Sequence, residues 1–214
     1  RCYYYNQSPL WHQGRDPCHK LGGKTCYVVK GSDSCWATYC GDMAPAFLAL
    51  QARVKIADPQ RAKTVPLQDL YSGDGENPTT LKQGQFITQV LLPPPTPNSR
   101  GAYIKLRRRQ AINFPLLGVA VHLHMEDGSS TIQEARIALT AVEKAPLLIP
   151  EASLLNGKSL SKGIPGGVLD AAHHKAHPMD NLLGFPPSYR KSMVKIYLER
   201  ALQQALQAAQ QKGK

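Results

Sequence analysis

The chain has 214 residues, of which 42% are hydrophobic and 19% charged, close to the averages for globular domains. These values exclude wholesale disorder, a collagen-like chain and a coiled coil, and the length suffices for one large domain or two small ones. The formal net charge of +11 favours an anionic partner or an acidic subunit surface without identifying either.

The first 40 residues contain all five cysteines, which are Cys2, Cys18, Cys26, Cys35 and Cys40. Disulfides that stabilised the whole chain would join distant segments, and an odd count leaves one thiol over. The intervals also lack the short Cys-x2-Cys or Cys-x4-Cys pairs that are typical of zinc sites. Four thiolates around an iron-sulfur cluster fit this spacing, because the connecting loops can have any length that the fold can close. Structural or unpaired thiols are the alternative.

Glycine and proline recur between these cysteines and predict a loop rather than a regular helix or strand. Backbone amides at Gly22 and Gly23 are candidates for hydrogen bonds to cluster sulfur, and Lys20, Lys24 and Lys30 are candidates for offsetting its negative charge. The alternative for each lysine is a solvated position in a turn-rich loop.

Beyond the cysteines the pattern is that of an α+β chain. Residues 43–57 predict a short helix that runs into a strand at 54–56, with Asp42 at the N-cap position. A further strand is predicted at 85–92. The proline-rich stretch 93–97 cannot be helical and predicts a boundary between two units.

The second unit predicts a three-stranded antiparallel sheet packed with helices. Its strands are expected at 102–108, 118–125 and 134–139, and the turn at 126–129 joins the second to the third as a hairpin. A long C-terminal helix is predicted from Ser188, its expected N-cap, because Val194, Leu198, Leu202 and Leu206 recur at every fourth position.

Two sets of polar residues in this unit are interpreted as surface features. His173, His174 and His177 lie near Asp170 at helical spacing, but no further ligand completes a catalytic zinc motif. Three consecutive arginines at 107–109 would alternate between the faces of a strand and so form no single phosphate-binding patch. No nucleophile-histidine constellation can be identified.

Membrane insertion and export are not supported by the sequence. The longest apolar stretch, 114–121, is far shorter than the roughly 20 residues that cross a bilayer. The first residues also lack the basic region, apolar core and cleavage site of a signal peptide.

Several segments together resemble one known family. RCYYYNQSPLW, GGKTC, SDSC and GDMAPAFLAL, followed by AYIKLRRRQAINFPLLGVAV, resemble the flavin-binding subunit of 4-hydroxybenzoyl-CoA reductase, in the xanthine oxidase family of molybdenum enzymes. The resemblance covers essentially the whole chain. It implies that residues 1–92 are the C-terminal portion of an FAD-binding domain with a cysteine-bearing insertion at about 2–40, and that 93–214 form the C-terminal domain of such flavoproteins.

The resemblance also implies particular cofactor ligands. Cys2, Cys18, Cys26 and Cys35 would hold a 4Fe-4S cluster, and Cys40 would not be a ligand. Asp42 stands where the family brings an aspartate to the flavin, and Lys105, with Tyr103 as a second candidate, would approach the isoalloxazine. The family's glycine-rich subdomain for the FAD pyrophosphate has no counterpart here, so most FAD contacts are expected from an N-terminal half that is missing.

The function that this resemblance implies is electron transfer in the cytoplasm. A ferredoxin-type donor would reduce the cluster, and electrons would pass through FAD to a small 2Fe-2S subunit and a large molybdopterin subunit. Neither nucleic acid nor a membrane is an expected partner. One alternative is the flavin subunit of another molybdenum hydroxylase, acting on an aldehyde or an aromatic acid. A more distant alternative is a basic zinc-dependent nucleic-acid-binding module.

Overall fold

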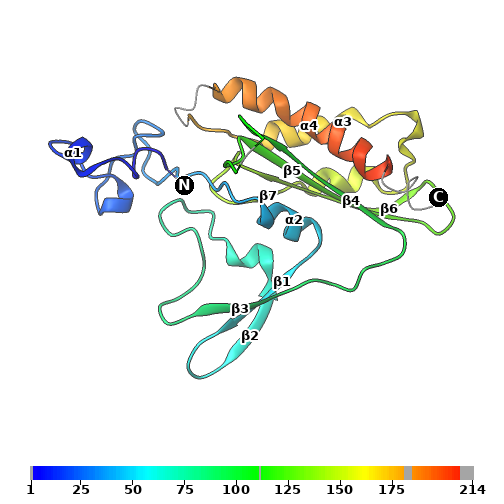
Figure 1. The fold of residues 1–214 in the computed structure, drawn as a ribbon, viewed down its shortest axis with the longest axis horizontal. Helices are drawn as coiled ribbons and strands as arrows, with labels where there is room; N and C mark the ends of the chain where they lie inside the picture. The colour runs from blue at the N-terminus through cyan, green and yellow to red at the C-terminus, as the bar shows by residue number, and fades with distance from the viewer. Residues whose placement is uncertain (1, 111, 181–184, 208–214) are drawn as a thin grey trace.

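The computed structural model describes residues 2–110, 112–180 and 185–207 and confirms the α+β class, with two antiparallel sheets in succession (Figure 1). The first part of the described chain contains α1 (Pro9–His12), α2 (Met43–Ala49), β1 (Arg53–Ala57), β2 (Ala62–Pro66) and β3 (Phe86–Leu91). The second contains β4 (Ser99–Leu106), β5 (Leu117–Met125), β6 (Ile132–Thr140), β7 (Leu147–Leu148), α3 (Gly166–Lys175) and α4 (Pro187–Gln207).

The smaller sheet has the order β2-β1-β3 and confirms the strands expected near 54–56 and 85–92. Val54 and Ile56 point to the same side of β1 and pack with Leu48 of α2 in a small core, as alternation along a strand requires. Strand β2 was not expected, because its residues are exposed or half-buried and carry no apolar alternation.

The larger sheet has the order β4-β5-β6-β7 and extends the three expected strands by a fourth. Strand β7 has two residues, too few for any periodic pattern to indicate it. The expected hairpin between β5 and β6 is present, and the Glu126 amide donates to the Thr131 carbonyl across it at 3.0 Å.

Helices cover both faces of the larger sheet (Figure 1). Helix α4 packs on β4 and β5, and α3 packs on α4. Helix α2 contacts β5, β6 and β7, and Ala138 of β6 belongs to the core that includes Leu48 of α2. The sheet is therefore covered on two sides, which explains why β5 is buried at every position except the half-buried His122 and His124.

Two local expectations are wrong. Helix α4 begins at Pro187, so Ser188 lies in its first turn, and proline is well suited to the first helical position. Strand β4 ends at Leu106, so the three arginines 107–109 are exposed beyond the strand and strand alternation does not separate them. Within the described residues, no helix combines the length and the apolar character needed to cross a membrane.

The cysteine-bearing segment lies to one side of the two sheets (blue in Figure 1). It has little regular structure, with one short turn of helix in α1 and a 3-10 turn at His19–Leu21. Its end is held close to the loop before β3, where a side-chain carbon on Gly75 would lie 2.4 Å from the Cys35 carbonyl. Only glycine permits this approach, which ties the segment to the rest of the fold.

Candidate functional site

Asp42, Tyr103 and Lys105 meet in one hydrogen-bonded cluster. The Tyr103 hydroxyl donates to Asp42 Oδ1 at 2.8 Å, and the Lys105 ammonium donates to Asp42 Oδ2 at 2.7 Å. Lys105 also donates to the Asn113 carbonyl at 2.5 Å. The structure thus brings together all three residues that the sequence singled out for a flavin, from positions about 60 residues apart.

Strand geometry explains why Tyr103 and Lys105 share this cluster. They are two residues apart on β4 and therefore project from one face of the sheet. Their partners on β5 are Ala120 and Gly118, respectively. A side-chain carbon on Gly118 would lie 2.5 Å from the Tyr103 hydroxyl, so the absence of a side chain at Gly118 leaves the space that this hydroxyl occupies.

Asp42 is held by the segment before α2 rather than by the helix itself. The Thr140 hydroxyl donates to the Gly41 carbonyl at 3.0 Å, and the Tyr39 backbone pairs with Ala141 and Glu143. These contacts fasten residues 39–41 to the end of β6. Asp42 occupies the N-cap position, but its side chain makes no capping hydrogen bond, because both carboxylate oxygens bind the sheet.

The electrostatics of the cluster favour a charged pair at the edge of the solvent. The Lys105 side chain is 16% exposed and that of Asp42 42%, so the lysine loses more hydration than the carboxylate. A partly buried lysine requires such a compensating charge and acceptors. The exposed side of the carboxylate remains accessible to a ligand.

Tyr103 makes the stability of the fold sensitive to alkaline pH. Burial, reinforced by the Asp42 carboxylate, raises its pKa above the ordinary value of 10.0. A pKa raised by folding stabilises the protein fully below the unfolded value and ceases to do so as the pH rises through the folded value. We expect the free energy of unfolding to fall above about pH 10, and Tyr103→Phe to make that fall shallower.

Urea unfolding from about pH 7 to about pH 11 measures this effect. The exposed Tyr5 provides the control variant Tyr5→Phe. An unchanged pH dependence in Tyr103→Phe would contradict the assignment.

The second candidate site is a narrow cleft in the cysteine-bearing segment. The residues that line it include four cysteines, Cys2, Cys18, Cys26 and Cys35, and exclude Cys40. Tyr4, Tyr27 and Trp36 also line the cleft and give it an aromatic wall. The free space is about 10 Å³, roughly enough for one water molecule.

The thiols of this cleft influence one another. Burial raises the pKa of Cys35, and the neighbouring Cys26 and Cys2 raise it further, whereas the Ala37 amide and the Lys20 ammonium lower it. All five cysteines are free thiols. Across the described part of the chain, no three His, Cys, Asp or Glu side chains form a group that could hold a metal ion.

The glycine amides do not have the role considered for them. The amide of Gly22 donates to the His19 carbonyl and that of Gly23 to the Cys18 carbonyl, so both are used within the turn. Lys20 does line the cleft, whereas Lys24 and Lys30 are exposed.

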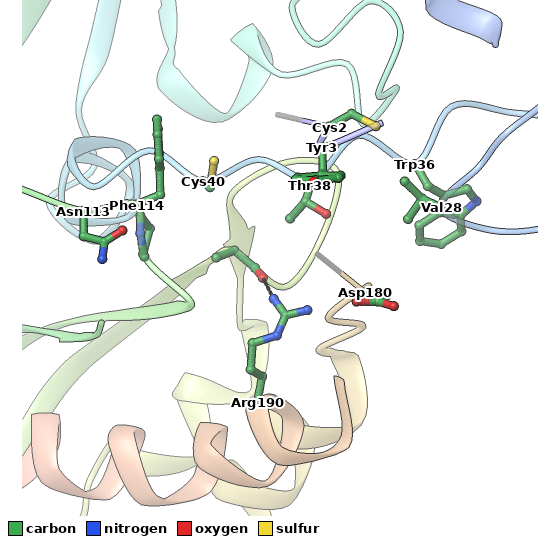
Figure 2. Close-up of a pocket in the computed structure, with 12 residues that line it drawn as sticks. Cys2, Tyr3, Val28, Trp36, Thr38, Cys40, Asn113, Phe114, Asp180 and Arg190 are labelled. Carbon is green, nitrogen blue, oxygen red and sulfur yellow. Dashed lines mark hydrogen bonds between the residues drawn. The ribbon is translucent and has the colours of Figure 1, made fainter. Parts of the chain in front are cut away.

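A larger cavity of about 270 Å³ lies beside both sites. Figure 2 shows Trp36 and Val28 on one side of it and Asn113 and Phe114 on another, with Arg190 reaching up from α4. Trp36 and Cys2 also line the cysteine cleft, and Asn113 binds Lys105 through its carbonyl. The cavity therefore adjoins both candidate sites.

Arg190 is a residue whose placement the sequence analysis missed. It lies four residues before Val194, in line with the apolar stripe of α4, and is 2% exposed. An arginine in register with an apolar stripe is unusual, since charged side chains are almost never fully buried unless paired. Its position in this stripe was the feature of the sequence from which its burial could have been predicted.

The histidines near Asp170 do not form a joint site. His177 Nδ1 lies 2.7 Å from Glu143 Oε1, whereas Asp170 pairs with Lys195 of α4. His173 and His174 lie on α3. The contacts of His177 and Asp170 are therefore separate, which agrees with their interpretation as surface features.

Two families match successive parts of the chain. Residues 22–95 match the FAD binding domain in molybdopterin dehydrogenase, and residues 101–205 match the CO dehydrogenase flavoprotein C-terminal domain.

Individual proteins show the same relationship. The chain is 32% identical over 185 residues to the FAD-binding subunit of an Escherichia coli K12 aldehyde oxidoreductase, PaoB, covering 79% of this chain and 54% of that subunit. It is 30% identical to the carbon monoxide dehydrogenase medium chain of Afipia carboxidovorans OM5, covering 77% and 55%. A crystal structure of the Cu,Mo-CO dehydrogenase superposes with a TM-score of 0.69 at 29% identity, covering 77% and 56%. The chain thus spans about half the length of the curated relatives it matches.

Proposed function

Because this chain belongs to the FAD-binding subunits of the molybdopterin dehydrogenase family, we propose that it is part of an electron-transfer subunit that binds FAD and a 4Fe-4S cluster. The observation that carries the proposal is the meeting of Asp42, Tyr103 and Lys105 in one cluster on the larger sheet. In this proposal residues 1–92 belong to the FAD-binding domain and 93–214 form the C-terminal domain.

The Asp42–Tyr103–Lys105 cluster has the chemistry to contact a flavin. A flavin ring presents hydrogen-bond donors and acceptors at its edge, and the cluster offers a half-exposed carboxylate and a lysine held in place by two acceptors. Bound FAD supplies one- and two-electron chemistry. The task of these residues is to bind and orient the ring, with Tyr103 fixing the carboxylate from the side.

The cysteine cleft has the donor set for an iron-sulfur cluster. Four thiols surround one cleft, the number that ligates a 4Fe-4S cluster, and aromatic side chains enclose it. The free space is about 10 Å³, and the described thiols are not grouped as metal ligands, so the segment would have to rearrange when the cluster is built. The segment carries only short helical turns and therefore has few ladder hydrogen bonds to break.

We assign the complete enzyme to molybdenum-dependent oxidoreductases with three kinds of subunit. The partners of this chain would be a large molybdopterin subunit and a small 2Fe-2S subunit, with a ferredoxin-type donor in the cytoplasm. The resemblance of the cysteine-bearing segment to that of 4-hydroxybenzoyl-CoA reductases favours such a reductase as the first candidate. The identity to an aldehyde oxidoreductase subunit favours a second candidate, a molybdenum hydroxylase for an aldehyde or an aromatic acid.

Anaerobic purification of the full-length subunit with its partners tests the proposal. We expect iron, acid-labile sulfide and FAD to copurify, with a broad brown absorbance band. Turnover with 4-hydroxybenzoyl-CoA, compared with aromatic aldehydes, separates the two candidates. A colourless protein that contains one zinc would overturn the redox function and favour the nucleic-acid-binding alternative.

A further inference from the structure

Arg190 places a positive charge inside the protein beside the cavity that adjoins both candidate sites. It lies on α4 and is 2% exposed, and its side chain reaches from the helix toward the cavity (Figure 2). Removing an ion from water costs several kcal/mol. A buried arginine therefore requires acceptors or an opposite charge nearby.

The partners of the guanidinium satisfy it incompletely. One terminal nitrogen donates to the Met179 carbonyl, and the other lies 3.5 Å from the Ala141 carbonyl. The buried Nε has no hydrogen-bond partner among the described residues. Burial lowers the pKa of Arg190, and the charge of Asp180 acts in the opposite direction. The two carbonyl partners carry no net charge, and within the described residues the guanidinium keeps one buried nitrogen without a hydrogen bond.

Arg190 lines the same cavity as residues of both candidate sites. Cys2 and Trp36 line both the cavity and the cysteine cleft. Asn113, on another wall of the cavity, accepts the hydrogen bond from Lys105. Apolar and aromatic side chains make up much of the remaining wall, and electrostatic interactions are screened less in such surroundings than in water.

We propose that Arg190 is a charge-compensating residue, which stabilises the extra negative charge that the redox centres beside this cavity acquire on reduction. The inference rests on the proposed function. Reduction of a cluster with four thiolate ligands takes up one electron from a reductant and forms or breaks no bond, so its net charge becomes more negative by one. A buried cation nearby favours that state and raises the reduction potential.

An anchoring role alone does not account for a charged residue here. A neutral donor could bind the Met179 and Ala141 carbonyls with a smaller loss of hydration. What an arginine adds is a permanent charge, which persists at any physiological pH. An experiment can separate the two roles of Arg190, because loss of its charge changes the reduction potential of a nearby redox centre and loss of an anchoring hydrogen bond alone does not.

Reductive titration with dithionite of the complete enzyme, followed by visible absorbance and electron paramagnetic resonance, tests the proposal. In Arg190→Gln we expect a lower potential for the cluster or the flavin, with up to a tenfold smaller equilibrium constant for one-electron reduction, which is about 59 mV. Arg190→Lys should largely restore it. Asp180→Asn removes a negative charge from the same cavity wall and should shift the potential in the opposite direction.

Lys195→Gln is the matched control, because Lys195 lies on the same helix but pairs with Asp170 at the surface. Iron and FAD contents are measured first in every variant. If the wild-type enzyme contains no iron-sulfur cluster and no FAD, the proposed function fails. If cofactor contents are normal but the potentials of Arg190→Gln and Asp180→Asn equal that of wild type, only the role of Arg190 is overturned. Should Arg190→Gln fail to fold, the sign of the shift in Asp180→Asn decides.

Discussion

Replacing Cys26 by serine is expected to remove nearly all cluster iron from the anaerobically purified full-length subunit. Cys26 is buried and lines the cleft with Cys2, Cys18 and Cys35. A cluster held by four thiolates loses one of its ligands in this variant, and a serine hydroxyl is a poor substitute at neutral pH because it stays protonated. Iron and acid-labile sulfide per protein chain, together with the visible spectrum, measure the effect.

Cys40→Ser is the control for this experiment. Cys40 is a free thiol of the same segment that lines the large cavity and is absent from the wall of the cysteine cleft. Its iron content should equal that of the unaltered protein. Equal losses of iron from the two variants would refute the assignment of ligands, because the loss would then reflect damage to the segment as a whole.

Replacing Lys105 by alanine is expected to weaken FAD retention by the full-length subunit about tenfold. A hydrogen bond to a charged group contributes roughly 1.5–3 kcal/mol, and a buried partner left without one incurs a further penalty. Without Lys105, the Asp42 carboxylate keeps only the Tyr103 hydroxyl, and the Asn113 carbonyl loses its donor. The FAD content after gel filtration and the dissociation constant from flavin fluorescence both report on it.

Two further variants test whether the Asp42–Tyr103–Lys105 cluster contributes to FAD binding through its charges. Asp42→Asn keeps the size of the side chain but removes the ion pair with Lys105, so its FAD retention should also fall. Lys63→Ala removes one positive charge from an exposed position on β2 and should have no effect. Unchanged FAD content in both Lys105→Ala and Asp42→Asn would exclude these two residues from flavin binding.

Much of the strand pattern could be predicted from local sequence, because apolar runs and turn residues are features of short segments. The run around Val119 and Val121 in β5 and the hairpin that follows are examples. The same reasoning missed β2 and β7, whose pairing partners lie elsewhere in the chain and whose own residues carry no pattern. It placed Asp42 correctly at the N-cap position of α2 but gave no indication that its carboxylate binds β4.

The candidate sites divide in the same way. Local sequence showed that all five cysteines gather near the start of the chain. It gave no means of deriving which four thiols line one cleft, since a loop without a repeating pattern has no predictable path. Arg190 is a similar case, because periodicity places it in the stripe of α4 without indicating that it reaches a cavity.

The amino-acid sequence alone determined the α+β class, the cysteine-bearing segment and the position of most strands, because these depend on composition and on short-range periodicity. Only the tertiary structure decided that Asp42 meets Tyr103 and Lys105, that Cys40 lies outside the cysteine cleft and that Arg190 is buried beside a cavity. These contacts join residues far apart in the chain. Their partners are chosen by sheet register and helix packing, which no local pattern encodes.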